Sequence, residues 1–152
     1  MDKLRLFLML LVVAVVAACS SGSDGDDDGM IPNPNPSPNV DFAVREQTKT
    51  SAHPQFGAGS NHGYTIDGIE GKELTLARGT TYIFDVNTPG HPFYISTSLI
   101  GQGAGEVTEG VTNSKTTNGT LSFTPNGNHP DLLYYQCDVH DNMGWKINIV
   151  DP

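Results

Sequence analysis

Cys137, His140 and Met143 follow one another at three-residue intervals near the end of a 152-residue chain. An apolar segment ends at Cys137 and another begins after Trp145, so we expect these side chains to lie on one turn between two strands. A thiolate, an imidazole and a thioether are soft ligands that suit copper. Zinc favours four strong nitrogen or sulfur ligands, and a thioether is a poor one. The spacing therefore predicts a copper site that needs one more ligand.

A second imidazole would complete a trigonal set of two histidines and a cysteine with a weak axial methionine. The chain has five histidines. His91 is the best candidate because predicted strands at 81–86 and 93–97 bracket it, whereas His62 and His129 lie in Gly- and Asn-rich segments and are expected to be exposed. The predicted ligands of one copper ion are therefore His91, Cys137, His140 and Met143.

Each predicted ligand has a structural alternative. Met143 could fill a gap in the core, as methionine often does, and Cys137 could be an inert buried thiol. The alternative of a Cys19–Cys137 disulfide also stays open. No acid–base pair, nucleophile triad or phosphate-binding loop accompanies these residues in the sequence, so we do not expect an enzyme.

The segments that must position these residues have the residue pattern of β-strands. Short runs rich in Thr, Ile, Val, Tyr and Phe alternate with Gly, Asn, Pro and Asp, and no stretch keeps a period of 3.6 residues. Residues 98–118 are weakly patterned and are expected to form a long loop with at most one irregular strand. The pattern predicts an all-β fold, an antiparallel β-sandwich or barrel. Strands are expected at 40–46, 63–67, 73–77, 81–86, 93–97, 120–124, 132–136 and 146–150.

The first residues have the pattern of a secretory signal peptide. Two basic residues precede an apolar run at 6–16, which is shorter than the about 20 residues that cross a bilayer. Ala17-Ala18-Cys19 resembles a bacterial lipobox, in which small residues precede a cysteine that carries lipid. We therefore expect a lipoprotein signal peptide over 1–18 and lipidation of Cys19. An ordinary signal peptide, or an uncleaved anchor, is the alternative.

Composition separates a tether from a domain. Residues 19–40 contain mainly Ser, Gly and Asp and then alternating Pro and Asn, so they cannot bury a core and are predicted to be a disordered tether. Residues 41–152 are predicted to be the folded domain. The formal net charge of −9 argues against nucleic acid as a partner and favours basic ones. Asp138 and Asp141 flank His140 and could form an acidic rim or a solvated loop.

With these motifs in place, the sequence resembles the cupredoxin family over about residues 63–152. Some small cupredoxins share the spacing Cys137-x-x-His140-x-x-Met143, whereas others have a longer gap between the histidine and the methionine. Small cupredoxins also have a first histidine at a distance comparable to that of His91. The resemblance implies a Greek-key fold of about seven or eight strands. It also makes Cys137 the thiolate ligand, His91 and His140 the equatorial imidazoles and Met143 the axial thioether. Pro92 departs from the family, which often has Asn after the first histidine.

The resemblance implies a type 1 (blue) copper protein that transfers single electrons between redox partners at the cell envelope, its copper cycling between Cu(I) and Cu(II). The expected partner is a redox protein, a basic cytochrome or an oxidase or reductase. A lipid anchor would hold the chain on the periplasmic side of the inner or outer membrane, or on the cell surface. One alternative is a copper-binding lipoprotein for storage or delivery. Another is a surface interaction module in which metal is incidental.

Overall fold

The computed structural model describes residues 39–152, which contain ten strands in two sheets and no helix. None of these residues forms a helix that could cross a membrane. The predicted signal peptide at 1–18, the predicted lipidation at Cys19 and nearly all of the predicted tether at 19–40 lie outside the described residues.

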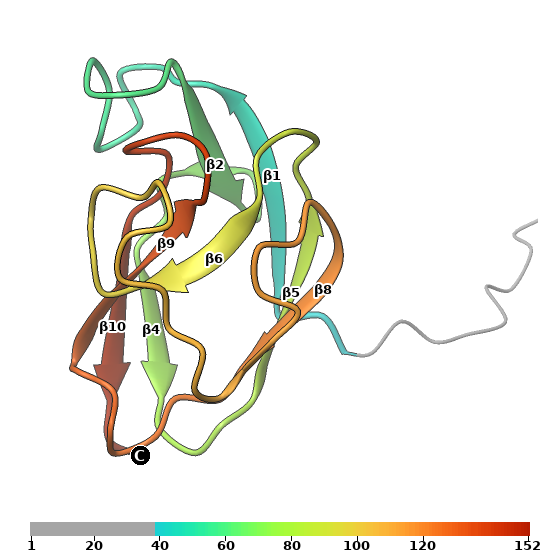
Figure 1. The fold of residues 1–152 in the computed structure, drawn as a ribbon, viewed down its shortest axis with the longest axis vertical. Helices are drawn as coiled ribbons and strands as arrows, with labels where there is room; N and C mark the ends of the chain where they lie inside the picture. Colours follow the sequence, from blue (N-terminus) through green and yellow to red (C-terminus); the bar gives the residue numbers. More distant parts are fainter. Residues whose placement is uncertain (1–38) are drawn as a thin grey trace, which may run out of the picture. The chain divides into compact units, whose positions relative to one another are not determined.

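The larger sheet has six strands in the order β3-β2-β1-β5-β8-β7 (Figure 1). Its strands are β1 (Phe42–Thr48), β2 (His62–Ile66), β3 (Ile69–Glu70), β5 (Tyr82–Asn87), β7 (Val111–Thr112) and β8 (Asn118–Phe123). The smaller sheet has four strands in the order β4-β10-β9-β6. They are β4 (Leu74–Ala77), β6 (Phe93–Ser96), β9 (Leu132–Cys137) and β10 (Lys146–Val150).

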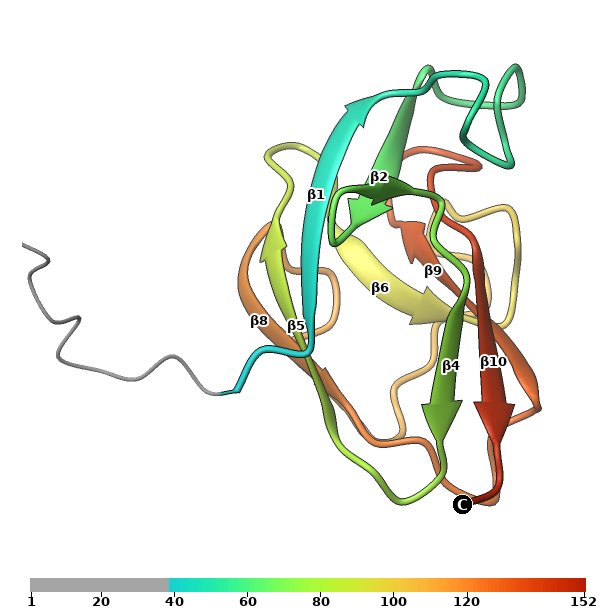
Figure 2. The same ribbon diagram turned by 180° about the vertical axis from the view of Figure 1, so that it is seen from behind.

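The prediction of an all-β sandwich is confirmed, and each of the eight predicted segments contains a strand. The sheets are mixed, whereas the sequence analysis expected antiparallel pairs throughout. β1 runs parallel to β5, and β4 runs parallel to β10. The reason is the path of the chain, which leaves the larger sheet for β4 and returns as β5 beside β1 (Figure 2). Residue patterns in single strands carry no signal for such a crossing.

Alternation along the strands builds the core between the two sheets. Leu74 and Leu76 are buried while Thr75 between them is exposed, because successive side chains of a strand face opposite sides. The aromatic rings gather around Phe93, whose ring centroid lies 5.3 Å from that of Tyr64 and 5.9 Å from that of Tyr135. These packed rings support the loops at one end of the sandwich.

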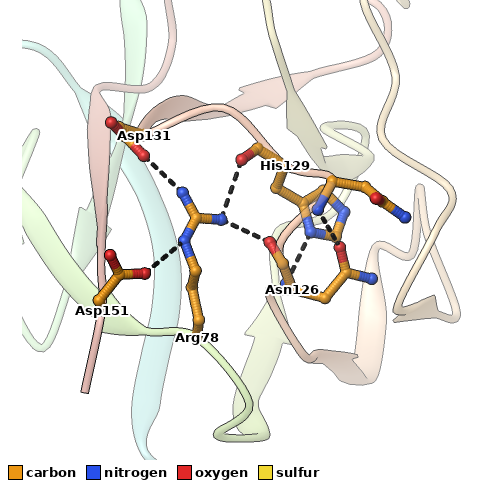
Figure 3. A network of polar contacts seen from close by, with 6 residues as sticks. Arg78, Asn126, His129, Asp131 and Asp151 are labelled. Carbon is orange, nitrogen blue, oxygen red and sulfur yellow. Dashed lines mark hydrogen bonds and ion pairs between the residues drawn. The ribbon is translucent and has the colours of Figure 1, made fainter.

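The opposite end of the sandwich is fixed by Arg78, which follows β4. Its guanidinium donates hydrogen bonds to the Asp131 carboxylate over 2.5 Å, to the Asp151 carboxylate over 3.1 Å and to the carbonyl oxygens of Asn126 and His129 (Figure 3). The network joins the β4–β5 turn, the β8–β9 loop and the C-terminal residues. It closes the end of the sandwich where β4 and β10 finish (Figure 1).

His129 belongs to this structural network, and the prediction that it is an exposed loop residue was wrong. It is 7% exposed and packs edge-on against the ring of Phe123. Its Nδ1 accepts a hydrogen bond from the amide of Asn126, and its Nε2 lies 3.1 Å from the carbonyl oxygen of Glu109. A buried imidazole with both nitrogens satisfied has no free position for a ligand.

Candidate functional site

The predicted site lies at the end of the sandwich where β1, β5 and β9 finish (Figure 1). Cys137 is the last residue of β9, and His140 follows in the loop that leads to β10. β6 pairs antiparallel with β9 in a register that sets Phe93 opposite Cys137. His91 precedes Phe93 by two residues, so this register brings the β5–β6 loop to the end of β9. Strand pairing therefore brings His91 close to Cys137, although 46 residues separate them in the sequence.

Three of the four predicted residues offer ligand atoms to one point. The ligand atoms of His91, Cys137 and His140 all lie within 4.8 Å of one another. The Sγ of Cys137 is 3.8 Å from Nδ1 of His140, and the two imidazole centroids are 4.7 Å apart. A tetrahedral zinc-like ion with bonds of 2.0–2.1 Å to nitrogen and 2.3 Å to sulfur would separate these two ligand atoms by about 3.5–3.6 Å. Cys137 and His140 could therefore bind one ion with little movement of the sulfur and nitrogen atoms.

His91 has a nitrogen that the protein leaves unpaired. Within residues 39–152, its Nδ1 is the one buried side-chain nitrogen or oxygen without a hydrogen-bond partner. Such a buried group costs about 1–3 kcal/mol unless something else pairs with it. Burial lowers the pKa of His91, while the nearby Glu46 carboxylate acts in the opposite direction. The ring is therefore held in its neutral form near pH 7.

The backbone around His91 is firmly positioned. Its carbonyl oxygen accepts hydrogen bonds from the hydroxyls of Tyr64 and Thr88, both over 2.8 Å. Tyr64 is fully buried, and burial followed by the proximity of Cys137 raises its pKa well above the ordinary value. Tyr64 therefore joins the His91 loop to β2. The sequence analysis did not select Tyr64, because its partners are distant in the chain.

Met143 and Cys137 are both fully buried and belong to the same hydrophobic core. The Met143 carbonyl oxygen accepts a hydrogen bond from the amide of Tyr64 over 2.7 Å, and Nε2 of His53 lies 3.2 Å from it. Cys137 is a free thiol. Its alternative disulfide partner, Cys19, lies outside the described residues. The role of the Met143 sulfur as a ligand stays a prediction beside its role in the core.

A buried ammonium ties this loop to the segment between β1 and β2. Lys49 is 6% exposed, and its Nζ donates to the carbonyl oxygens of Gln55, Ala58 and Asn142 over 2.9, 2.6 and 3.0 Å. Burial lowers the pKa of Lys49, and the Asp141 carboxylate opposes that effect. Lys49 could not be selected from the sequence, because every residue has a backbone carbonyl and the sequence does not show which carbonyls a lysine will contact.

Glu46 and His62 lie on the other side of His91. The Oε2 of Glu46 is 2.7 Å from Nδ1 of His62 and 4.0 Å from Nε2 of His91. His62 is half-buried at the start of β2, so the prediction of an exposed loop residue was wrong for it as well. Glu46 was not selected, although it alternates with the buried Val44 along β1 and hence faces the same side.

Asp138, one of the two aspartates beside His140, has partners in the neighbouring loops. Asp138 forms an ion pair with Lys115 over 2.9 Å, and Lys115 also pairs with Glu106. The amide of Asp138 donates to the carbonyl oxygen of Pro92 over 2.9 Å. Pro92, which cannot donate, therefore joins the two loops as an acceptor. Lys115 is shared between Asp138 and Glu106, so one positive charge faces two carboxylates and the charge of Asp138 is only partly offset.

Comparison with known proteins places this site in a family. The model of the At5g54830-like domain matches residues 60–151, which is more than half of the chain. The chain belongs to the At5g54830-like domain family. The matched region includes all four predicted ligands, so the At5g54830-like domain contains the predicted site.

Two curated relatives carry similar segments. The chain is 33% identical over 100 residues, 57% of its length, to the cytochrome b561, DM13 and DOMON domain-containing protein At5g54830 of Arabidopsis thaliana. It is 42% identical over 33 residues, 22% of its length, to isoforms B/C of protein Skeletor of Drosophila melanogaster. These matches span 11% and 4% of the relatives' own lengths. No solved structure gives a significant match to the chain.

These matches overturn several predictions. The chain is not a cupredoxin, so the blue-copper identity and the electron-transfer function inferred from that resemblance were wrong. The alternative of a copper-storing or copper-delivering lipoprotein, and the bacterial lipoprotein identity itself, find no support in the matches either. The three-residue spacing of Cys137, His140 and Met143 misled because it specifies only a turn after a strand, and unrelated β-sandwiches can carry such a turn.

Proposed function

We propose that this domain is a metal-binding module that holds one copper ion through His91, Cys137 and His140, with Met143 as a weaker ligand. The observation that carries the proposal is the buried, unpartnered Nδ1 of His91, which belongs to a ring beside a second imidazole and a buried thiol. Two imidazoles, a thiolate and a thioether form a soft set that suits copper better than zinc. When bound, copper would supply a centre that can change its oxidation state.

The name of the plant relative supports a redox-active ion over an inert one. That name places a domain of this kind in one protein with a cytochrome b561 domain and a DOMON domain. Zinc has no redox chemistry, whereas copper does. The proposal concerns binding of the ion, and electron transfer by a blue-copper protein is no part of it. A redox protein as partner and a location at the cell envelope stay predictions.

A competition titration tests the proposal. The full chain in its reduced form is titrated with Cu(I) against the chelator bicinchoninate. We expect one equivalent to bind, and Cys137→Ser and His140→Gln to weaken that binding by more than the about 10–100-fold that is typical when a residue behind the ligands is changed. His129→Gln, which alters an imidazole at the opposite end of the sandwich, should bind as the wild type does.

Unfolding midpoints of all variants are measured alongside, so that loss of the fold is separated from loss of a ligand. A wild-type chain that fails to compete for Cu(I), or a folded Cys137→Ser variant with unchanged affinity, would overturn the proposal.

A further inference from the structure

Glu46, His62 and His91 form a second group whose ligand atoms all lie within 4.8 Å of one another. The imidazoles of His62 and His91 stack with centroids 5.3 Å apart and an interplanar angle of 22°. This group needs neither Cys137 nor His140. It shares with the copper site proposed above only the ring of His91.

Strand register brings these three side chains together. In the β1–β2 pair, Glu46 lies opposite Tyr64 and Thr48 lies opposite His62. Glu46 and His62 are therefore diagonal neighbours on one face of the sheet. β5 runs parallel to β1 with Asn87 beside Arg45, so the segment that follows β5 emerges at the same end as Glu46. His91 is part of that segment.

The distances around the Glu46 carboxylate point to a shared cation. Its Oε2 is hydrogen-bonded to Nδ1 of His62, but the 4.0 Å to Nε2 of His91 is too long for a hydrogen bond. A tetrahedral zinc ion with bonds of 2.0–2.1 Å separates its oxygen and nitrogen ligands by about 3.3 Å. The two observed separations, 2.7 and 4.0 Å, lie on either side of this value. Sub-ångström adjustments would therefore bring each imidazole to the spacing that an ion shared with the carboxylate requires, and the two imidazole nitrogens lie within 4.8 Å of each other.

The ring of His91 has a nitrogen for each group. Its Nε2 faces the carboxylate of Glu46, whereas its Nδ1 is buried and unpaired. The two nitrogens of an imidazole are distinct positions, and each can bind a metal. One ring therefore has a nitrogen available for each group, with the sub-ångström adjustment given above.

We propose that Glu46, His62 and His91 form a second metal site, selective for a divalent ion of the zinc type, with water as its fourth ligand. Two imidazoles, a carboxylate and an open position form a known zinc arrangement. The side chains of His62, Glu46 and His91 are 45%, 24% and 13% exposed, so the ion can enter from solvent. Binding of the ion releases the proton between Glu46 and His62 to solvent, and a neutral His62 takes up a proton from solvent at Nε2, which then carries its one N–H. If both sites are filled, the His91 ring releases its remaining N–H proton to solvent.

The test uses zinc as the probe and Cys137→Ser as the background, because that substitution removes the thiolate of the copper site. Calorimetric titration of the full-length Cys137→Ser chain with Zn²⁺ should give one equivalent. Adding Glu46→Gln or His62→Gln should weaken binding by at least about tenfold, the lower end of the range for loss of one supporting group. Adding Glu73→Gln, a carboxylate on the segment before β4, should leave it unchanged. Nitrogen-15 spectra should show the ring signals of His62 and His91 shifting with Zn²⁺ while those of His129 stay in place.

Two results would overturn the second site. One is a Cys137→Ser chain that binds no Zn²⁺. The other is Zn²⁺ binding that Glu46→Gln leaves unchanged and that does not shift the His62 signals, because Glu46 then serves only as the hydrogen-bond partner of His62. Neither result bears on Cu(I) binding by the wild type, so the two sites succeed or fail separately.

Discussion

At the scale of single residues, Gly144 determines how closely the loop after Met143 packs on β9. A Cβ at this position would lie 1.6 Å from the carbonyl oxygen of Tyr135, a backbone atom that cannot swing aside. The Gly144 amide also donates to Oε1 of the buried Gln136 over 3.1 Å. Only glycine fits at this position, because any Cβ would overlap the backbone of Tyr135.

Gly144→Ala should lower the free energy of unfolding by about 3 kcal/mol or more, because overpacking against backbone forces the loop away from β9. Urea denaturation followed by tryptophan fluorescence, with Trp145 as the probe, would measure the loss. Gly127→Ala is the matched control, because a Cβ there meets nothing within 4 Å. Equal stability of the two variants would contradict the close packing.

Residue types in the sequence were sufficient to select His91, Cys137 and His140, which the fold brings together. They were not sufficient for Glu46 or Lys49. A carboxylate on a strand reads as a surface residue, and a lysine reads as a solvated charge, unless the neighbouring strands and carbonyl groups are known. Which family the residues belong to was also not readable from one short motif.

At the scale of elements, Lys49 joins the β1–β2 segment to the β9–β10 loop. Its ammonium donates three hydrogen bonds to backbone carbonyl oxygens from both segments. A methionine has similar length but no donor, so the carbonyl oxygens of Ala58 and Asn142 would lose this donor, while that of Gln55 would keep only the Ala58 amide. The β1–β2 segment and the β9–β10 loop would then lose one of their polar connections, beside that of the Ser60 amide to the Asp141 carbonyl oxygen.

Lys49→Met should lower the free energy of unfolding by at least about 2 kcal/mol, since hydrogen bonds from a charged donor are worth about 1.5–3 kcal/mol each. Lys72→Met removes a surface ion pair with Asp67 and should cost less than about 1 kcal/mol. Thermal and urea unfolding of both variants would compare them. A Lys49→Met variant no weaker than Lys72→Met would contradict the connecting role.

Glu70 connects β3 to the end of β1. The amide and hydroxyl of Thr50 and the side-chain amide of Gln47 donate hydrogen bonds to its carboxylate over 2.9, 2.8 and 2.7 Å. These bonds, first among them the one from the Thr50 amide, lower the pKa of Glu70 below its ordinary value of 4.5. A depressed carboxyl pKa stabilises the fold above the unfolded value, and this contribution is lost as pH falls through the folded value.

Glu70→Gln should therefore lower stability at pH 7 by less than about 1 kcal/mol, as for other partly exposed groups. Its difference from the wild type should shrink as the pH is lowered below the ordinary value of 4.5, because the wild-type carboxylate becomes protonated as the pH passes through its lowered pKa. Urea midpoints measured at intervals of pH would show this convergence. A constant difference at every pH would assign the effect to packing instead of charge.

At the scale of the whole molecule, alternation of apolar residues was enough to predict an all-β sandwich and the positions of eight strands. It was not enough for the mixed sheets, because β1 and β5 become neighbours only after the chain has crossed to the other sheet and returned. The two-residue strands β3 and β7 are too short to show any period. The same crossing places Glu46, His91 and Cys137 at one end of the sandwich, so the site is a consequence of topology that local patterns cannot reveal.

X-ray absorption at the copper edge of the Cu(I)-loaded full chain would identify the atoms bound to the ion. We expect one short copper–sulfur bond together with imidazole nitrogen scattering from two rings, and loss of the short sulfur bond in Cys137→Ser. A first shell of nitrogen and oxygen alone in the wild type would contradict the claim that His91, Cys137 and His140 hold the metal.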